Sequence, residues 1–131
     1  MAFAFTIKSA RSDAELAFVT FEGDYYTVEL RGSEVSAVRS IWGYTDCQIL
    51  VDLLRHLAQQ ERGWKDPIEW GSIESDLMLR FRSDPHGHVF VDIEIRHCRG
   101  EEDWLVKAIV QTELGQLPMI ASKAAAFFQC K

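Results

Sequence analysis

Residues that cross-link or interrupt small domains are scarce in this chain. The 131 residues include three prolines and three cysteines, and Cys47, Cys98 and Cys130 are far apart with no CxxC pair. An odd, scattered set of cysteines does not build a disulfide framework, so we expect reduced structural thiols and a cytoplasmic location. Long apolar runs are missing too. No segment approaches the roughly 18 residues that span a bilayer, so no membrane association is expected.

A basic surface is also missing. Lys and Arg number 14 against 20 Asp and Glu, which gives a formal net charge of −6, and the basic residues are scattered. Proteins that track nucleic-acid phosphates need clustered Lys and Arg, so direct binding of nucleic acid is not expected. An acidic domain is instead steered toward a basic partner. Phosphate-binding loops and dinucleotide fingerprints are absent as well, and we expect no cofactor.

The hydrophobic content and the length of the chain are typical of one folded domain. Hydrophobic residues make up 47% of the chain, which is enough to form a real core at this length. The opening segment MAFAFTIKSA has no basic leader region, so we interpret it as a first strand and not as a signal peptide. The prediction is a single domain over residues 1–131.

Alternating apolar residues predict strands before and after one amphipathic helix. ELAFVTFEGDYYTVELRG predicts two strands around a turn at Gly23 and Asp24. EVSAVRSIW predicts another strand, whose inward face is open between Val35 with Ala37 and Val38 with Trp42. Three further strands are predicted in DLMLRFRS, HVFVDIEIRH and DWLVKAIVQTEL.

The helix is predicted in TDCQILVDLLRHLAQQERG, where the apolar side chains share one helical face. Thr45 and Gln48 have the spacing of a capping box, and Gly63 suits a left-handed helix end. Pro118 fits the first turn of a closing helix. The predicted fold class is α+β, with an antiparallel sheet of about seven or eight strands. One long central helix and a C-terminal helix would pack on one face of that sheet.

The stretch SDPHGHVFVDIEIRHC predicts a hairpin. Asp84, Pro85, His86 and Gly87 have the order of a type I turn that closes with a glycine bulge. This turn sets Phe81 opposite Val91 and Arg80 opposite Asp92, and it puts the apolar pairs on one face. We expect a cross-strand ion pair between Arg80 and Asp92.

The histidines of the same stretch do not predict a metal site. His88 and His97 are an odd number of residues apart, so they point to opposite faces of the strand, roughly 30 Å from one another. His86 in the turn can approach His88, but two histidines are an incomplete ligand set. The expectation is no bound metal.

No catalytic group is predicted either. Cys47 lies in the first helical turn, where a helix dipole lowers a thiol pKa, but it shares the apolar side with Leu50 and Leu54. Ser72 lacks the glycine pattern of a nucleophile elbow. A structural role for both residues is the better interpretation.

Seven residues are candidates for partner contacts. Glu101, Glu102 and Asp103 form an acidic run in a loop, which is either a solvated charge cluster or a contact for a basic protein. Glu74 and Asp76 form a second acidic pair. The remaining two, Trp64 and Trp70, flank the connection from helix to strand, where they are either a lid over the helix end or hot-spot anchors.

Several short motifs lie between Ile41 and Ile95, and together they form a recognisable pattern. They are Trp42-Gly43, Gly63-Trp64, Trp70 with Ser72 and Glu74, Leu77 and Leu79, Asp84, and Gly87-His88-Val89. With these motifs the chain resembles a bacterial family of small proteins of unknown function. The layout is also similar to that of immunity proteins paired with bacterial toxins of the cell-wall-associated type. The resemblance implies an architecture and carries no catalytic residue.

Three hypotheses for function follow. The first is a non-catalytic immunity protein that neutralises a basic toxin through acidic and aromatic contacts. The second is a small-ligand-binding domain or modest enzyme with a pocket near Trp70, Glu74 and His88. The third is a structural or oligomerisation module, for example a homodimer paired through exposed strand edges.

Overall fold

The computed structural model describes residues 4–98 and 100–130 and consists of two antiparallel four-stranded sheets and two helices. The first sheet contains β1 (Phe5–Lys8), β2 (Glu15–Glu22), β3 (Tyr25–Arg31) and β4 (Ser36–Trp42). Helix α1 (Thr45–Ala58) follows. The second sheet contains β5 (Ile68–Gly71), β6 (Leu77–Ser83), β7 (His88–His97) and β8 (Trp104–Glu113), and a short 3-10 turn leads into α2 (Leu117–Phe127).

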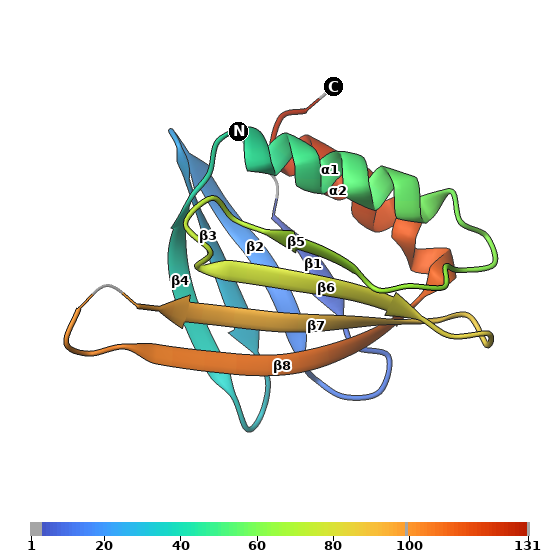
Figure 1. Cartoon of the computed structure of the whole chain (residues 1–131), viewed down its shortest axis with the longest axis horizontal. Coiled ribbons are helices and arrows are strands. Elements are labelled where there is room, and N and C mark those ends of the chain that lie inside the picture. The colour runs from blue at the N-terminus through green and yellow to red at the C-terminus, as the bar shows by residue number, and fades with distance from the viewer. Residues whose placement is uncertain (1–3, 99, 131) are drawn as a thin grey trace.

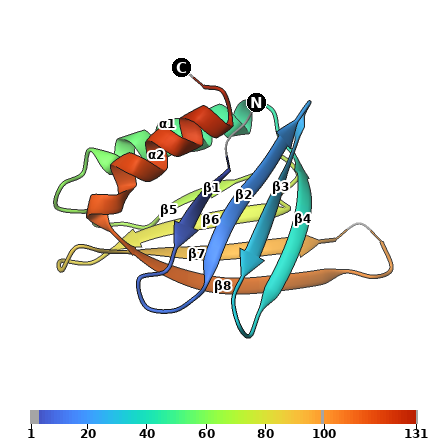
Figure 2. The same ribbon diagram turned by 180° about the vertical axis from the view of Figure 1, so that it is seen from behind.

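The two sheets face one another with their strands crossing at a large angle, and both helices lie together on one side (Figures 1 and 2). The α+β class is as predicted, but two separate sheets replace the single expected one. The physical reason lies between β4 and β5. A helix, not a hairpin, connects these strands, so they do not pair, and each sheet buries its apolar face against the other. None of the helices in the described residues is long and apolar enough to cross a bilayer.

The first sheet and α2 are held together by aromatic rings. Phe5 and Phe18 stack with ring centroids 4.4 Å apart, and Phe127 of α2 meets both rings edge-on. Phe128 meets the ring of Tyr26 edge-on at 5.2 Å. Each fully buried ring of this size contributes about 1.5–3 kcal/mol to stability, so this cluster fixes α2 on the inner face of the first sheet.

The second sheet confirms the predicted hairpin. Phe81 pairs with Val91, Arg80 pairs with Asp92, and the apolar partners are buried on the inner face. Gly87 has the positive φ (86°) that the glycine bulge requires, and the Asp84 carboxylate accepts hydrogen bonds from the backbone N–H of His86 and His88. The turn and the register are therefore those that the sequence indicated.

Helix α1 begins at Thr45, where the predicted segment begins, but its capping and its C-terminal end differ from the prediction. No side chain caps the helix, whose N-cap residue is Tyr44. Asp46, already inside the first turn, instead accepts hydrogen bonds from the backbone N–H of Tyr44 and of Ile73. The helix ends at Ala58, well before Gly63. Gly63 does have a positive φ (82°), but it serves a close approach, since an added Cβ would lie 2.6 Å from Ser83 Oγ.

The structure also decides which face of β4 points inward. Ala37 and Ile41 are buried, whereas Val38 is 57% exposed. Arg39 shares the inward face and is half-buried. The alternative with Val38 and Trp42 inward is therefore excluded.

Candidate partner-binding surface

Two of the predicted contact residues are buried in the junction between the sheets. Trp70 is 5% exposed, and its indole N–H donates to the backbone carbonyl of Asp46 at 2.9 Å. Asp76 is 4% exposed and pairs with Arg39 at 3.0 Å, and Arg39 also donates to the carbonyl of Arg96. These side chains join β4, α1, the β5–β6 loop and β7, so they are not available to a partner.

Trp64 and Glu74 have different surroundings. The Trp64 indole N–H donates to the carbonyl of Phe81, and its backbone exchanges two hydrogen bonds with the Ser83 hydroxyl. Trp64 thus attaches the α1–β5 connection to β6. Glu74 is exposed in the β5–β6 loop beside Ile73, which is 47% exposed.

The acidic run is a predicted contact group whose members all lie on the surface. Glu101, Glu102 and Asp103, here named the acidic loop, are all exposed between β7 and β8. The apolar residues that follow are exposed as well: Trp104 by 38% and Leu105 by 51%. An acidic group and a partly exposed aromatic group are therefore adjacent at this end of the second sheet.

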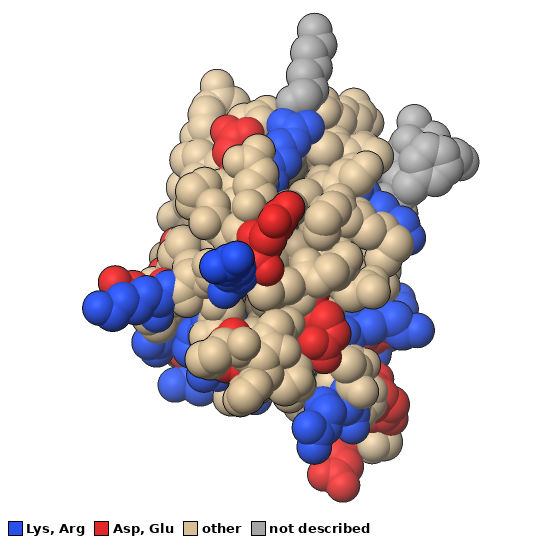
Figure 3. Space-filling view, turned by 90° about the vertical axis from the view of Figure 1, so that its right-hand side faces the viewer, with Lys and Arg blue, Asp and Glu red and all other residues tan. Residues whose placement is uncertain are grey.

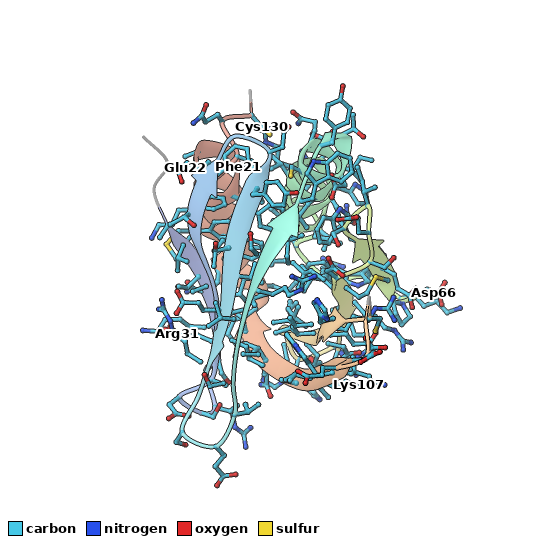
Figure 4. The ribbon with its side chains drawn as sticks, turned by 90° about the vertical axis from the view of Figure 1, so that its left-hand side faces the viewer. Phe21, Glu22, Arg31, Asp66, Lys107 and Cys130 are labelled. Atoms are coloured by element: carbon cyan, nitrogen blue, oxygen red, sulfur yellow. The ribbon has the colours of Figure 1, made fainter. Side chains whose placement is uncertain are left out.

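The outer face of the second sheet is hollowed. A cavity of about 650 Å³ extends across β5 to β8 between Glu69 and Lys107, and Met78 and Ile109 contribute apolar surface to it. Ile109 is 61% exposed. Figure 4 shows Lys107 on the side of this sheet that faces away from the first sheet. The hollow is open to solvent and reaches β8.

Ion pairs cross this outer face, but one of them differs from the prediction. Arg82 forms two hydrogen bonds to the Asp92 carboxylate, at 2.9 and 2.7 Å. Arg80, the expected partner of Asp92, instead lies 3.9 Å from Glu69. Because the sheet is twisted, long side chains reach diagonal neighbours as well as direct cross-strand partners. Arg82 is diagonal to Asp92, and the bidentate geometry of this pair favours it over Arg80. The pKa of the Arg82 guanidinium is raised by these hydrogen bonds.

The model of a family of unknown function, DUF6228, matches residues 7–131. The chain belongs to this family. No curated protein and no solved structure matches it. The predicted resemblance to an uncharacterised family is thereby confirmed, whereas the bacterial origin and the similarity to immunity proteins stay predictions.

In this DUF6228 member the candidate reactive groups do not assemble. Burial, together with the nearby Asp46 and Cys130, raises the pKa of the Cys47 thiol to about 12, so the thiol stays protonated at neutral pH. His86 and His88 have ring centroids 6.3 Å apart at one end of β7, and His97 is at the other end. These three histidines therefore do not converge on a common point.

The pocket proposed near Trp70, Glu74 and His88 is not formed either. The Arg96 backbone N–H binds the carbonyl of Asp76, which places the β5–β6 loop beside the far end of β7. His88 begins that strand, roughly 26 Å from Arg96 at about 3.3 Å per residue. His88 instead contacts the Asp84 carboxylate at 2.8 Å.

An exposed aromatic group on the first sheet was not predicted from the sequence. Tyr25 is 55% and Tyr44 67% exposed, and Trp42 stacks on Tyr44 with centroids 6.4 Å apart. Tyr25 and Trp42 are cross-strand neighbours. The alternation of side chains along a strand could have predicted this exposure. Tyr25 alternates with the buried Tyr26, so it had to point outward.

Proposed function

We propose that this DUF6228 member is a non-catalytic binding protein of the immunity type, which acts in the cytoplasm and neutralises a basic toxin by occupying it. The observation that carries the proposal is the acidic loop, Glu101 to Asp103, continuous with the exposed apolar residues of β8. Interfaces of this kind combine charges that guide encounter with apolar anchors that supply affinity.

Charge placement supports a basic partner. The acidic loop carries three carboxylates in succession, and the net charge of the whole chain is −6. At the opposite end of the molecule, shown in Figure 3, lysine and arginine side chains alternate with acidic ones and neither sign forms a continuous patch. A basic protein approaching this molecule would therefore be drawn preferentially to the acidic loop.

Co-expression tests this proposal. The chain is expressed with the product of the neighbouring gene, and we expect that product to be toxic alone, harmless with the chain present, and co-purified with it. A neighbouring product that is harmless alone and does not co-purify would refute the proposal.

A charge-reversal variant locates the contact. E101K/E102K/D103K should weaken the complex at least about tenfold, with most of the change in the association rate and in its salt dependence. The matched control, E22K/E34K/E61K, changes net charge by the same amount at exposed acidic sites elsewhere. Equal weakening by both variants would mean that net charge, and not the acidic loop, governs binding.

The hollow supports a second candidate function, a binding site for a small molecule. Its volume of about 650 Å³ falls within the range of ligand sites, roughly 300–1,000 Å³. Apolar lining beside charges of both signs suits an amphipathic ligand. Thermal-shift screening of metabolite mixtures tests it, and a true ligand must lose its stabilising effect in Met78→Trp, which fills the hollow.

A further inference from the structure

One edge of the second sheet is open along half of β8. The strand order is β5-β6-β7-β8, so β8 is bonded in the sheet on one side only. Figure 1 shows it as the lowest strand of its sheet. The backbone N–H of Ala10, after β1, donates to the carbonyl of Gln111 at 2.7 Å, which covers the edge near the end of β8. The earlier part of β8 has no such cover among the described residues.

The hydrogen-bond pattern identifies the backbone groups that face this edge. In an antiparallel ladder, alternate residues direct both N–H and C=O to the same side. Because the Gln111 carbonyl points away from β7, the backbone groups of Ile109, Lys107 and Leu105 do so too. The Arg96 N–H bonds to Asp76 on the other side of β7, which gives the same parity, since Arg96 pairs with Leu105.

The same three residues have exposed side chains. Leu105 is 51% and Ile109 61% exposed, and Lys107 lies between them in contact with Glu94 at 3.3 Å. Within residues 4–98 and 100–130, no backbone hydrogen bond to these three residues is formed from outside the sheet. An exposed edge with apolar neighbours is a template for another strand.

We propose that an extended segment of the partner pairs with β8 along Leu105, Lys107 and Ile109, adding a fifth strand to the second sheet. This inference rests on the proposed function and specifies how the partner is held. Main-chain hydrogen bonds would supply affinity, and the side chains of alternate partner residues would lie beside the hollow and supply specificity.

Charge indicates what the added segment is like. The acidic loop immediately precedes β8, so basic residues are favoured in the part of the segment that lies beside Glu101 to Asp103. Lys107, in the middle of the edge, favours an acidic or neutral residue directly opposite. The segment is therefore extended, basic toward one end and not uniformly basic.

Lys107 also argues against a second copy of the chain as the occupant. A two-fold pairing of β8 with itself, centred on this edge, would set Lys107 opposite its own copy. Like charges directly opposite each other destabilise strand pairing. A heterologous partner is therefore favoured over a homodimer.

The open edge of the first sheet is a poorer template. The Gly43 N–H donates to the Asp24 carbonyl, which by the same alternation turns the backbone of Val38 outward on β4. Val38 is exposed, but Ser36 and Ser40 are its neighbours on that face, and the Arg39 side chain extends to the β7 carbonyl of Arg96. The acidic loop is absent from this edge, and the other large apolar residue on that face, Trp42, is half-buried and stacked on Tyr44. The edge therefore serves as a control.

Proline substitutions at the two edges test the inference. Lys107→Pro removes one outward-facing N–H and sterically blocks an added strand while leaving the ladder to β7 intact. Val38→Pro makes the same change on β4. Using the co-purified neighbouring-gene product, we expect Lys107→Pro to weaken binding at least about tenfold, from lost main-chain bonds and obstruction, and Val38→Pro to leave the dissociation constant unchanged.

The outcomes separate this inference from the function on which it rests. If Lys107→Pro is folded and binds like the wild type, strand addition is refuted, and the immunity proposal stands. If the wild type itself forms no complex, both fail. If Lys107→Pro does not fold, the test is hydrogen exchange of backbone amides in the wild-type protein, compared between the complex and the free chain. Slowed exchange at Leu105, Lys107 and Ile109 supports pairing, and unchanged exchange refutes it. A wild-type dimer whose formation is abolished by Lys107→Pro would assign the edge to self-association instead.

Discussion

The two sheets have the same topology and differ in the use of their surfaces. Each is a four-stranded antiparallel sheet of consecutive strands. The inner face of the first sheet includes the aromatic rings of Phe5, Phe18 and Tyr26 among aliphatic residues, and Phe5 and Phe18 contact α2, whereas the inner face of the second sheet is mainly aliphatic. The outer face of the second sheet has a hollow, ion pairs and exposed apolar residues near an open edge.

We infer that the first sheet serves mainly the stability of the fold and the second sheet mainly binding. The first sheet packs its inner face against α2, whereas the outer face of the second sheet is exposed to solvent and carries the hollow and the ion pairs. Changes on the inner face of the first sheet should therefore affect stability, and changes on the outer face of the second sheet should affect binding with little loss of stability.

Phe18→Ala should be the most damaging of these changes. Its ring is fully buried and contacts Phe5, Tyr26 and Phe127, so its removal should cost about 3–5 kcal/mol. Ile109→Ala on the outer face of the second sheet should change stability by less than about 0.5 kcal/mol. Urea unfolding followed by tryptophan fluorescence measures both values. Equal costs would contradict the proposed separation.

Gly43→Ala should come next, because this glycine allows the first sheet to approach α1. An added Cβ would lie 2.6 Å from Cys47 Sγ and 2.8 Å from the Tyr26 ring. Overpacking of this kind costs about 1–3 kcal/mol. Gly115→Ala is the matched control, since nothing lies within 4 Å of its Cβ position. Thermal unfolding of the two variants compares them, and a neutral Gly43→Ala would show that the junction is loosely packed.

On the outer face of the second sheet, Arg82→Ala should cost about 1 kcal/mol, because a two-pronged, partly exposed ion pair contributes modestly. Arg80→Ala should cost only about 0.3 kcal/mol, since its contact with Glu69 is long and exposed. Denaturant unfolding distinguishes them. A larger loss for Arg80→Ala would restore the pairing that the sequence suggested.

The smallest effect is expected at Asp84, and it depends on pH. Partial burial tends to raise the pKa of the Asp84 carboxyl, but hydrogen bonds from the backbone N–H of His88, from its ring and from the backbone N–H of His86 lower it below the ordinary value. The ionised carboxylate therefore stabilises the fold above the ordinary pKa, about 4, and that contribution is lost as pH falls through the lowered value.

Asp84→Asn removes this linkage, so the variant should lose less stability than the wild type as pH is lowered below about 4. The measurement is the urea midpoint as a function of pH. Asp66→Asn, an exposed change in the α1–β5 connection, should follow the wild-type curve. Parallel curves for all three proteins would show that the Asp84 turn contributes no acid-sensitive stability.

Much of the second sheet was predictable because two independent signals agreed. The turn residues Asp84 to Gly87 set a register, and the alternation of apolar residues demanded the same one. The division into two sheets was not predictable. Alternation tells which side chains share a face, but it does not tell which strands share an edge, and the helix between β4 and β5 left that pairing open.

The candidate surface was predicted only in part. The acidic loop lies on the surface as expected, since three consecutive carboxylates are rarely buried. Trp70 and Asp76 are instead internal, because their hydrogen-bonding groups are satisfied by Asp46 and Arg39, residues distant in sequence. The open edge of β8 could not be predicted from the sequence, because it depends on where the loop after β1 crosses the second sheet.

The topology also bears on the order in which the chain folds. Every strand pairs only with its neighbour in sequence within each sheet, so each meander closes short loops, and local contacts of this type favour fast formation. The ring contact between Phe5 and Phe127 joins the first strand to the last helix. We therefore expect the two meanders to form early and the docking of α2 on β1 to complete folding.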